Sequence, residues 1–353
     1  MSLRDHIINR ITTEGPMRLD DYMTTCLLHP TLGYYTTRDP FGQAGDFTTA
    51  PEISQMFGEL IGLCLAQKWL NDGAPDRFTL AELGPGRGTL MADALRACRT
   101  VPGFLDAAQI TLIEASPTLR ARQLETLSGY DVTWRDDAAH LPDQPLYLIA
   151  NEFFDALPIR QFTRDGENWR ERQIGLQGGA LMMGQGAALP QPSLAHRLDD
   201  TKDGDVIETC AAGISILNTI SKRIDTCGGA ALIIDYGDWR SLGDTFQALE
   251  NHQSIDPLAT PGNADLTAHV DFEALATAST PALYTKLTPQ GVFLERLGVT
   301  ARAQNLAAAL NGTARDAHIK AHRRLTHPAE MGNLFKVLGL YQNGKLPPPG
   351  LDA

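Results

Sequence analysis

The clearest chemical pattern is an acid and three alternating glycines that follow the apolar run at 78–83, namely Glu82, Gly84, Gly86 and Gly88. Glycines let the backbone turn sharply and approach a ligand closely, because no Cβ atom stands in the way. A helix expected to begin at Thr89 would present free N–H groups and a positive dipole end to that ligand. The segment therefore predicts a cofactor-binding turn. A purely structural tight turn is the alternative.

The spacing of these glycines bears on the kind of cofactor. G-x-G-x-G differs from the dinucleotide fingerprint G-x-G-x-x-G, whose third glycine would fall at Thr89. Glu82 is placed to hold a cationic ammonium group and would repel a pyrophosphate. A ligand with an amino-acid end and a nucleoside end meets both conditions, so we expect S-adenosylmethionine rather than NAD.

Further acids follow the next two strand-like runs. In an open parallel sheet, ligands bind beyond the carboxyl ends of the strands. Glu114 ends the run at 109–114, where a carboxylate can accept hydrogen bonds from both ribose hydroxyls of a nucleoside. Asp136 and Asp137 follow the run at 131–134, and either could accept from an adenine amino group. The alternatives are a solvent-exposed acid at Glu114 and a solvated turn at Asp136.

The run at 145–150 ends in the segment NEFFDALP, which spans Asn151 to Pro158. Two acids, Glu152 and Asp155, stand there beside an amide and two phenylalanines. This combination predicts a concave site that is both apolar and charged. Helix capping by Asn151 and Asp155 is the structural alternative.

A loop rich in glycine, threonine and aromatic residues lies upstream, within residues 33–59. It leads into a helix that is expected to begin at Pro51-Glu52 and to carry an apolar stripe of core residues. Such a loop could fold over a cofactor as a lid. The alternative is an ordinary surface turn before a helix.

Strand-like and helix-like runs alternate through the middle of the chain, and these elements must position the acids and glycines. Buried strands are expected at 78–83, 109–114, 131–134, 145–150 and 229–236. Helices are expected at 89–98, 117–127 and 210–226. This alternation predicts an α/β fold with a doubly wound, mostly parallel sheet whose strands are buried on both faces.

Two segments interrupt the alternation and are interpreted as insertions that build a substrate wall. Residues 161–205 mix charged, Gly-rich and Pro-rich pieces typical of hairpins, and residues 241–330 combine turn residues with a helical run at 292–310. The remaining parts are an N-terminal helical and lid region at 1–75 and a core in two pieces at 76–160 and 206–240. A final strand with its tail is expected at 331–353.

Charge and composition argue against several classes of function. A net charge of −12 opposes nucleic-acid binding, which needs a basic surface. The five cysteines are scattered and the histidines show no ligand spacing, so no metal is expected and a cytosol-like compartment is indicated. No apolar run approaches membrane-spanning length, so no membrane insertion is expected.

Seven segments of the chain resemble, in order, those of the MidA family of S-adenosylmethionine-dependent methyltransferases: AGDFTTAPEISQMFGE, LAELGPGRGTLMADALR, LIEASPTLR, ANEFFDALPIRQF, ALIIDYG, DLTAHVDF and MGNLFKVL. That family includes the mitochondrial complex I assembly-factor arginine methyltransferase. The resemblance implies a class I methyltransferase fold, which is Rossmann-like, and S-adenosylmethionine as cofactor. For the mitochondrial members it also implies symmetric dimethylation of an arginine in a core subunit of respiratory complex I.

The resemblance also implies roles for particular residues. Glu82 and the three glycines match the cofactor loop of the family, Glu114 its ribose acid, and Asn151 with Glu152 the acid of the fourth strand. The lid segment is matched by Asp46, Phe47, Thr48, Thr49 and Glu52. Other protein arginine methyltransferases clamp the guanidinium between two glutamates. Here the chain continues as IRQF where the second would stand, so Asp155 or Glu52 would supply it.

The expected function is S-adenosylmethionine-dependent methylation of a protein arginine, with Glu152 and Asp155 as the catalytic candidates. The alternatives are a non-catalytic complex I assembly or scaffold factor and a small-molecule methyltransferase with a closed pocket. We expect a protein substrate, and a homodimer stays open. The N-terminal segment has neither the apolar core of a signal peptide nor the character of a transit peptide, and the second absence favours a bacterial cytoplasm; a processed organelle protein would lie in the mitochondrial matrix.

Overall fold

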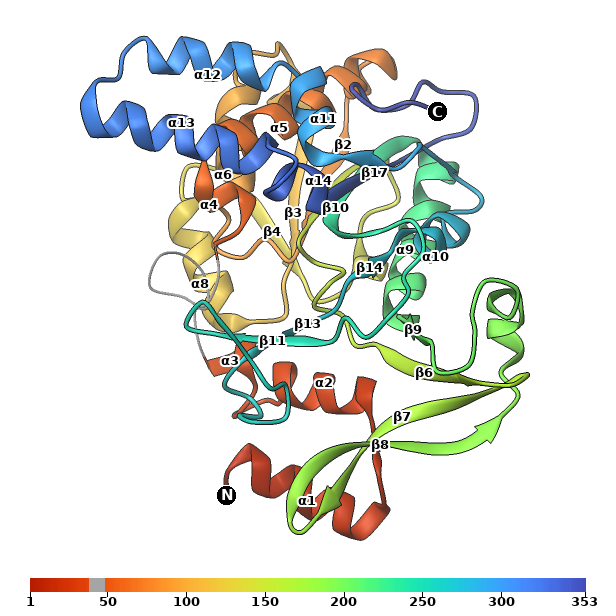
Figure 1. Cartoon of the computed structure of the whole chain (residues 1–353). Coiled ribbons are helices and arrows are strands. Elements are labelled where there is room, and N and C mark those ends of the chain that lie inside the picture. Colours follow the sequence, from red (N-terminus) through yellow and green to blue (C-terminus); the bar gives the residue numbers. More distant parts are fainter. Residues whose placement is uncertain (38–47) are drawn as a thin grey trace.

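The computed structural model describes residues 1–37 and 48–353, and Figure 1 shows how its helices surround a central sheet. This nine-stranded sheet has the order β15-β17-β10-β5-β2-β3-β4, with β14 beside β10 and β16 beside β17. Its strands are β2 (Phe78–Leu83), β3 (Ala108–Ile113), β4 (Val132–Arg135), β5 (Leu146–Asn151), β10 (Gly229–Asp238), β14 (Val270–Asp271), β15 (Leu283–Tyr284), β16 (Thr288–Pro289) and β17 (Phe335–Tyr341).

The pairing of these strands confirms the expected fold class. Five neighbours, from β4 through β3, β2 and β5 to β10, pair in parallel, and β17 then pairs antiparallel with β10. The five expected strands each fall within two residues of the predicted positions. The carboxyl ends of the parallel strands therefore meet at one edge of the sheet, where ligands of such folds bind.

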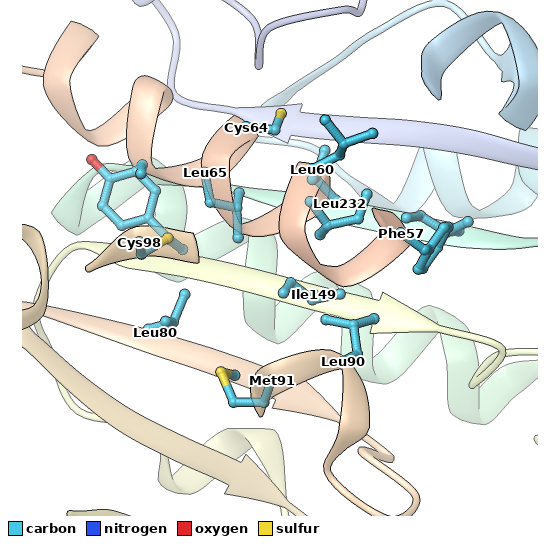
Figure 2. Packing of buried hydrophobic residues seen from close by; sticks show 14 of the residues in the cluster. Phe57, Leu60, Cys64, Leu65, Leu80, Leu90, Met91, Cys98, Ile149 and Leu232 are labelled. Atoms are coloured by element: carbon cyan, nitrogen blue, oxygen red, sulfur yellow. The ribbon is translucent and has the colours of Figure 1, made fainter. Parts of the chain in front are cut away.

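The central strands are buried on both faces because helices cover each side. Every residue of β2 and of β5 is buried. On one face, shown in Figure 2, Leu80, Ile149 and Leu232 pack against helices α5 (Gln55–Asn71) and α6 (Thr89–Cys98). On the other, Leu148 and Ile233 pack against α9 (Ala211–Cys227) and α10 (Phe272–Ala278). Alternate strand residues point to opposite faces, so a continuous apolar run serves both layers.

Helix α6 lies unusually close to α5, and this contact fixes the position of the glycine turn before α6. A Cβ atom at Gly62 of α5 would lie 2.6 Å from Cα of Ala94, and one at Gly58 would lie 2.7 Å from Cβ of Asp93. Only glycine therefore permits this approach of the two helices. The start of α6, where the cofactor turn ends, is held by that packing.

A second sheet of five strands contains the hairpins expected within 161–205. Its order is β1-β7-β6-β9, with β8 beside β7, and all of its pairs are antiparallel. The strands are β1 (Met17–Arg18), β6 (Arg160–Asp165), β7 (Asn168–Gln177), β8 (Ala180–Leu189) and β9 (Val206–Thr209). The edge strand β1 comes from the N-terminal region. The division of the chain into core and insertions stays a prediction.

The remaining elements flank these two sheets. The expected helical run at 292–310 is split at Gly298, whose φ is +89°, into α11 (Gln290–Arg296) and α12 (Val299–Ala307). A three-stranded sheet is formed by β11 (Gln247–Glu250), β12 (Gln253–Ile255) and β13 (Asp265–Thr267). The other helices are α1 (Leu3–Glu14), α2 (Leu19–Leu28), α3 (Tyr34–Thr37), α4 (Ala50–Ile53), α7 (Phe104–Ala107), α8 (Pro117–Thr126), η1 (Ala138–His140), η2 (Pro192–Arg197), α13 (Gly312–Thr326) and α14 (Met331–Leu334).

None of the helices in the ranges 1–37 and 48–353 is both long enough and apolar enough to cross a membrane. In the same ranges, no three or more His, Cys, Asp and Glu side chains are grouped so that they could hold a metal ion.

Candidate active site

The glycine turn after β2 has the backbone that the sequence pattern predicts. Gly84, Gly86 and Gly88 have φ values of +56°, +54° and +81°, and Gly88 is the N-cap residue of α6. Ordinary residues rarely adopt this left-handed region, so the turn depends on glycine. A Cβ atom at Gly84 would also lie 2.8 Å from Cδ2 of Phe153. The turn therefore stays open only because that position has no side chain.

Glu82, the acid before the turn, is 3% exposed and its Oε2 has no hydrogen-bond partner within the described part of the chain. Burial, together with the nearby charge of Glu114, raises the pKa of Glu82 to about 8. A buried carboxyl oxygen without a partner is costly in an isolated protein. A cationic ligand group would satisfy that oxygen and favour the ionised form.

Glu114 lies directly beyond β3 and is buried, which rules out the alternative of a solvent-exposed acid. Its Oε1 accepts a hydrogen bond from the N–H of Ser116 at 2.8 Å, and its Oε2 accepts from Nε2 of Gln123 at 3.1 Å. Burial raises the pKa of Glu114, and these two hydrogen bonds oppose that rise. Gln123 also donates to the carbonyl oxygen of Gly86 at 2.7 Å, so one side chain joins this acid to the glycine turn.

A cavity of about 590 Å³ joins the turn to Glu114. Gly84, Gly86 and Glu114 form part of its wall, and α2 and α3 supply the opposite side through Leu27 and Tyr35. The fit to S-adenosylmethionine rests on three observations: the open cradle at Gly84, the unpartnered Oε2 of Glu82, and acceptors at two strand ends that suit an ammonium group and ribose hydroxyls.

Asp136 lines the same cavity, but its side chain is 82% exposed and forms an ion pair with Arg120. The neighbouring Asp137 caps the short helix η1 by accepting a hydrogen bond from the N–H of Ala139 at 2.8 Å. Asp136 is thus as exposed as a solvated turn residue, although it also lines the cavity. Its role in binding adenine stays a prediction.

The turn after β5 contains no helix, so the helix-capping alternative for Asn151 and Asp155 is wrong. Asn151 is the last residue of β5, and Glu152 follows with a φ of +51°, in the left-handed region that favours glycine. Oε1 of Glu152 accepts hydrogen bonds from the N–H of Ala50 at 2.9 Å and from Nδ2 of Asn151 at 3.2 Å. The first of these bonds links the turn to the start of α4.

One buried carboxylate holds this turn in place. Oδ2 of Asp235, in β10, accepts hydrogen bonds from three successive backbone N–H groups, those of Phe153 at 3.2 Å, Phe154 at 2.9 Å and Asp155 at 3.2 Å. Three backbone donors aimed at one oxygen form an anion-binding concavity, here occupied by a side chain of the protein itself. Asp235 therefore sets the path of the chain on which Glu152 and Asp155 stand.

Three carboxyl groups lie close together at the carboxyl ends of β5 and β10. Burial raises the pKa of Glu152 to about 7 and that of Asp155 to about 6. Burial, followed by the charges of Asp155 and Glu152, raises the pKa of Asp235 well above its usual range. Oδ1 of Asp155 has no hydrogen-bond partner among the described residues. Raised pKa values of this kind identify a place where a positive charge would be favourable.

Part of the expected lid segment is described. Thr49 is the N-cap residue of α4, and Oε1 of Glu52 accepts a hydrogen bond from Oγ1 of Thr89 at 2.6 Å. Thr49, Glu52, Glu82, Asn151 and Glu152 surround a small cavity of about 30 Å³. Thr48 lines a separate cavity together with Glu52. Asp46 and Phe47 lie outside the described residues.

Several side chains that contribute to this site do not stand out in the sequence. Tyr35 lines the cavity of about 590 Å³ that joins the glycine turn to Glu114, and its hydroxyl donates to Oδ1 of Asp265 at 2.7 Å. Gln123 and Ser116 hold Glu114, but they are polar residues of a helix and its cap and have no motif of their own. Asp235 could have been found, because it stands near the carboxyl end of the apolar run ALIID, where the same strand-end rule applies.

Comparison with known proteins gives the same class of protein as the geometry. Residues 60–289 match the family Methyltransf_28, described as "Putative S-adenosyl-L-methionine-dependent methyltransferase". A crystal structure of a Burkholderia thailandensis protein bound to S-adenosyl-homocysteine superposes with a TM-score of 0.82, at 29% identity, covering 99% of this chain and 92% of that one.

Two curated relatives match over nearly the whole chain. The Xenopus laevis mitochondrial protein arginine methyltransferase NDUFAF7 is 34% identical, covering 98% of this chain and 85% of that protein. The human protein of the same name is 33% identical, covering 97% of this chain and 83% of that protein.

The parallel sheet and these comparisons thus define an S-adenosylmethionine-dependent methyltransferase with the class I fold. The chain belongs to the Methyltransf_28 family, which is the MidA family indicated by the sequence segments.

Proposed function

We propose that this protein transfers the methyl group of S-adenosylmethionine to a guanidinium nitrogen of an arginine in a protein substrate. The observation that carries the proposal is the pair of desolvated carboxyl groups, Glu152 and Asp155, on the turn beside the cofactor cavity. The curated relatives named as protein arginine methyltransferases support it, because they match nearly the full length of this chain.

The electrostatics of this turn favour a cationic acceptor over a neutral one. A guanidinium between Glu152 and Asp155 would bring a positive charge to two carboxyls whose pKa values burial has raised, and would favour their ionised forms. Its planar array of N–H donors matches two carboxylates with good directionality. Oδ1 of Asp155, buried and without a partner in the described ranges, would gain one.

The residues of the chain then have separate tasks. When bound, S-adenosylmethionine supplies an activated methyl group. Glu82, Glu114 and the three glycines would hold it, with Asn151 and the lid residues Thr48, Thr49 and Glu52 beside them. Glu152 would orient the guanidinium and accept the proton that its nitrogen loses on methylation, while Asp155 would hold a second nitrogen. The rate gain would come mainly from alignment in a site that excludes water.

The finer parts of the proposal rest on the family resemblance. We infer that the substrate is a core subunit of respiratory complex I and that the product is a symmetrically dimethylated arginine. A bacterial cytoplasm or a mitochondrial matrix would each bring enzyme and substrate together. Mass spectrometry for methylarginine in complex I subunits, with and without this gene, tests both inferences. Unchanged subunit masses would contradict them.

Replacing Glu152 tests the proposed mechanism. Glu152→Gln keeps the side-chain volume and one acceptor oxygen but removes the charge that would orient the guanidinium. We expect methyl transfer to fall by about a hundredfold or more, because residues that act electrostatically at an active site have effects of this size. Calorimetry with S-adenosyl-homocysteine should show unchanged affinity.

The matched control is Glu167→Gln, which removes one charge from an exposed hairpin turn that lines neither the cofactor cavity nor the small cavity at Glu152. It should retain wild-type turnover. Equal turnover of Glu152→Gln and wild type would exclude Glu152 from the mechanism. If Glu152→Gln loses transfer but fully restores complex I assembly in a deletion strain, the scaffold alternative would be favoured instead.

A further inference from the structure

A second cavity, of about 610 Å³, opens beside the candidate site between α4, the glycine turn and α13. Among the described residues, its charged lining side chains are Arg87 from the turn, Lys320 and Arg324 from α13, and Glu52 from α4. Helix α13 packs against α4 (Figure 1). We call it the basic cavity, because Lys320 and Arg324 bring two positive charges from α13 to its described lining.

The basic cavity is adjacent to the proposed arginine-binding turn. Glu52 lines both this cavity and the small one that also contains Glu82, Asn151 and Glu152. The positive charge of Arg324 acts on Glu152 and favours the ionised form of its carboxyl. A peptide whose arginine reaches Glu152 would thus place neighbouring residues in the basic cavity.

Two cations of α13 have no ion-pair partner within the described part of the chain. Lys320 and Arg324 are exposed and have no hydrogen-bond or ion-pair partner among residues 1–37 and 48–353. By contrast, the adjacent Arg323 pairs with Glu330 at 2.9 Å. The acid of the cavity, Glu52, already accepts a hydrogen bond from Thr89. In a chain with a net charge of −12, two exposed cations without an ion-pair partner among the described residues stand out beside the site, and they would repel a strongly basic peptide.

We propose that the basic cavity binds an acidic residue next to the target arginine, so that the enzyme selects arginines with a carboxylate neighbour in the substrate chain. This inference rests on the proposed function, since it names a feature of the substrate of that same site. Opposite charges across an interface contribute mainly to specificity and to the rate of association, which is what substrate selection requires. The cavity would thus discriminate against arginine-rich segments.

The test compares two fluorescent peptides that differ only beside one central arginine, with glutamates in the first and glutamines in the second. Binding is measured by anisotropy in the presence of S-adenosyl-homocysteine. We expect the wild type to bind the glutamate peptide about tenfold more tightly, and this preference to decrease with added salt. The variant K320E/R324E should lose the preference completely.

The matched control is R315E, because Arg315 lies on α13 without lining the basic cavity. It should keep the preference of the wild type. Equal binding of the two peptides by the wild type, or a preference that persists in K320E/R324E, would overturn the inference.

Cofactor binding and methylation give two further outcomes. If K320E/R324E loses affinity for S-adenosyl-homocysteine, the cations serve the cofactor carboxylate and the inference is wrong. If the wild type prefers the glutamate peptide but methylates no arginine in either peptide, the proposed arginine chemistry fails while acidic recognition stands.

Discussion

Glu152 combines a strained backbone with a partly buried carboxyl group at the wall of the cavities. Its φ of +51° is unfavourable for a residue with a side chain, at a cost of about 1 kcal/mol or more. Burial raises the pKa of its carboxyl to about 7, although Ala50 and Asn151 both donate hydrogen bonds to it. Strain and desolvation at one residue are typical of a position that serves binding rather than stability.

The raised pKa of Glu152 has a consequence for stability that can be measured. The folded protein holds this proton up to about pH 7, whereas a glutamate in the unfolded chain loses it near its ordinary pKa of about 4.3. The folded state therefore binds more protons in this window, and the contribution of Glu152 to the free energy of unfolding falls as pH rises through it.

Glu152→Gln removes this contribution, so the variant should gain stability relative to wild type between about pH 5 and about pH 8. We expect a relative gain of about 1–2 kcal/mol, measured by urea unfolding at both pH values. A constant difference between the two proteins across this range would show that Glu152 does not titrate there.

Gly84 tests the cofactor turn at the same scale. Gly84→Ala would place a Cβ atom 2.8 Å from Phe153 at a φ of +56°, so the turn and the ring would both have to move. We expect the affinity for S-adenosyl-homocysteine to fall about tenfold or more, the result of roughly 1–2 kcal/mol of strain at the binding surface. Calorimetry measures this change directly.

Gly129→Ala is the appropriate control, because Gly129 is exposed and a Cβ atom there would meet nothing within 4 Å. It should bind S-adenosyl-homocysteine as the wild type does. If both alanine variants retain wild-type affinity, cofactor binding does not require the space at Gly84.

At the scale of elements, the turn after β5 depends on a neighbouring strand for its shape. Asp235 in β10 accepts hydrogen bonds from the N–H groups of Phe153, Phe154 and Asp155. Loss of this one carboxylate would therefore leave three backbone donors without their acceptor. Its other oxygen accepts from the N–H of Tyr236 at 2.9 Å. The register between β5 and β10 is thus linked to the position of the proposed catalytic acids.

Asp235→Asn replaces one of these acceptor oxygens by an NH₂ group that cannot accept a backbone N–H. We expect kcat/KM for methyl transfer to fall about tenfold or more through misplacement of the turn. Affinity for S-adenosyl-homocysteine should change little. Asp238→Asn, an exposed position in the same strand, should leave both quantities unchanged. A parallel loss of cofactor affinity in Asp235→Asn would mean that Asp235 supports the fold rather than the turn.

The five parallel strands from β4 to β10 could be predicted from the sequence because each signal is local, whereas the two-residue strands β14, β15 and β16 were not expected. Apolar runs buried on both faces, the glycine turn and Pro117 with its cap at Ser116 all lie within short windows. The second sheet could not be completed this way. Its edge strand β1 has only two residues, Met17–Arg18, and pairs with β7 across a large separation in sequence. Such pairing depends on tertiary contacts.

At the scale of the whole molecule, the sequence could predict only the part of the candidate site that lies directly after the parallel strands. The sequence could place Glu82, Glu114 and Glu152 together because acids at the carboxyl ends of parallel strands meet at one sheet edge, and their roles stay a prediction. Asp235 obeys the same rule, but its role depends on three backbone donors that no sequence pattern reveals. The basic cavity is formed by α13 and the turn at Arg87, more than half the chain apart, so only the fold brings its charges together.

The position of β17 in the sheet has a consequence for how the protein is made. All seven residues of β17 pair with β10. Without this pairing, the apolar strand β10 would be an exposed edge of the sheet. Every other strand of the sheet precedes it in the chain. During synthesis on the ribosome, the hydrogen-bonding edge of β10 therefore stays unpaired until residues 335–341 have been made. The growing chain is therefore expected to depend on molecular chaperones until that strand has emerged.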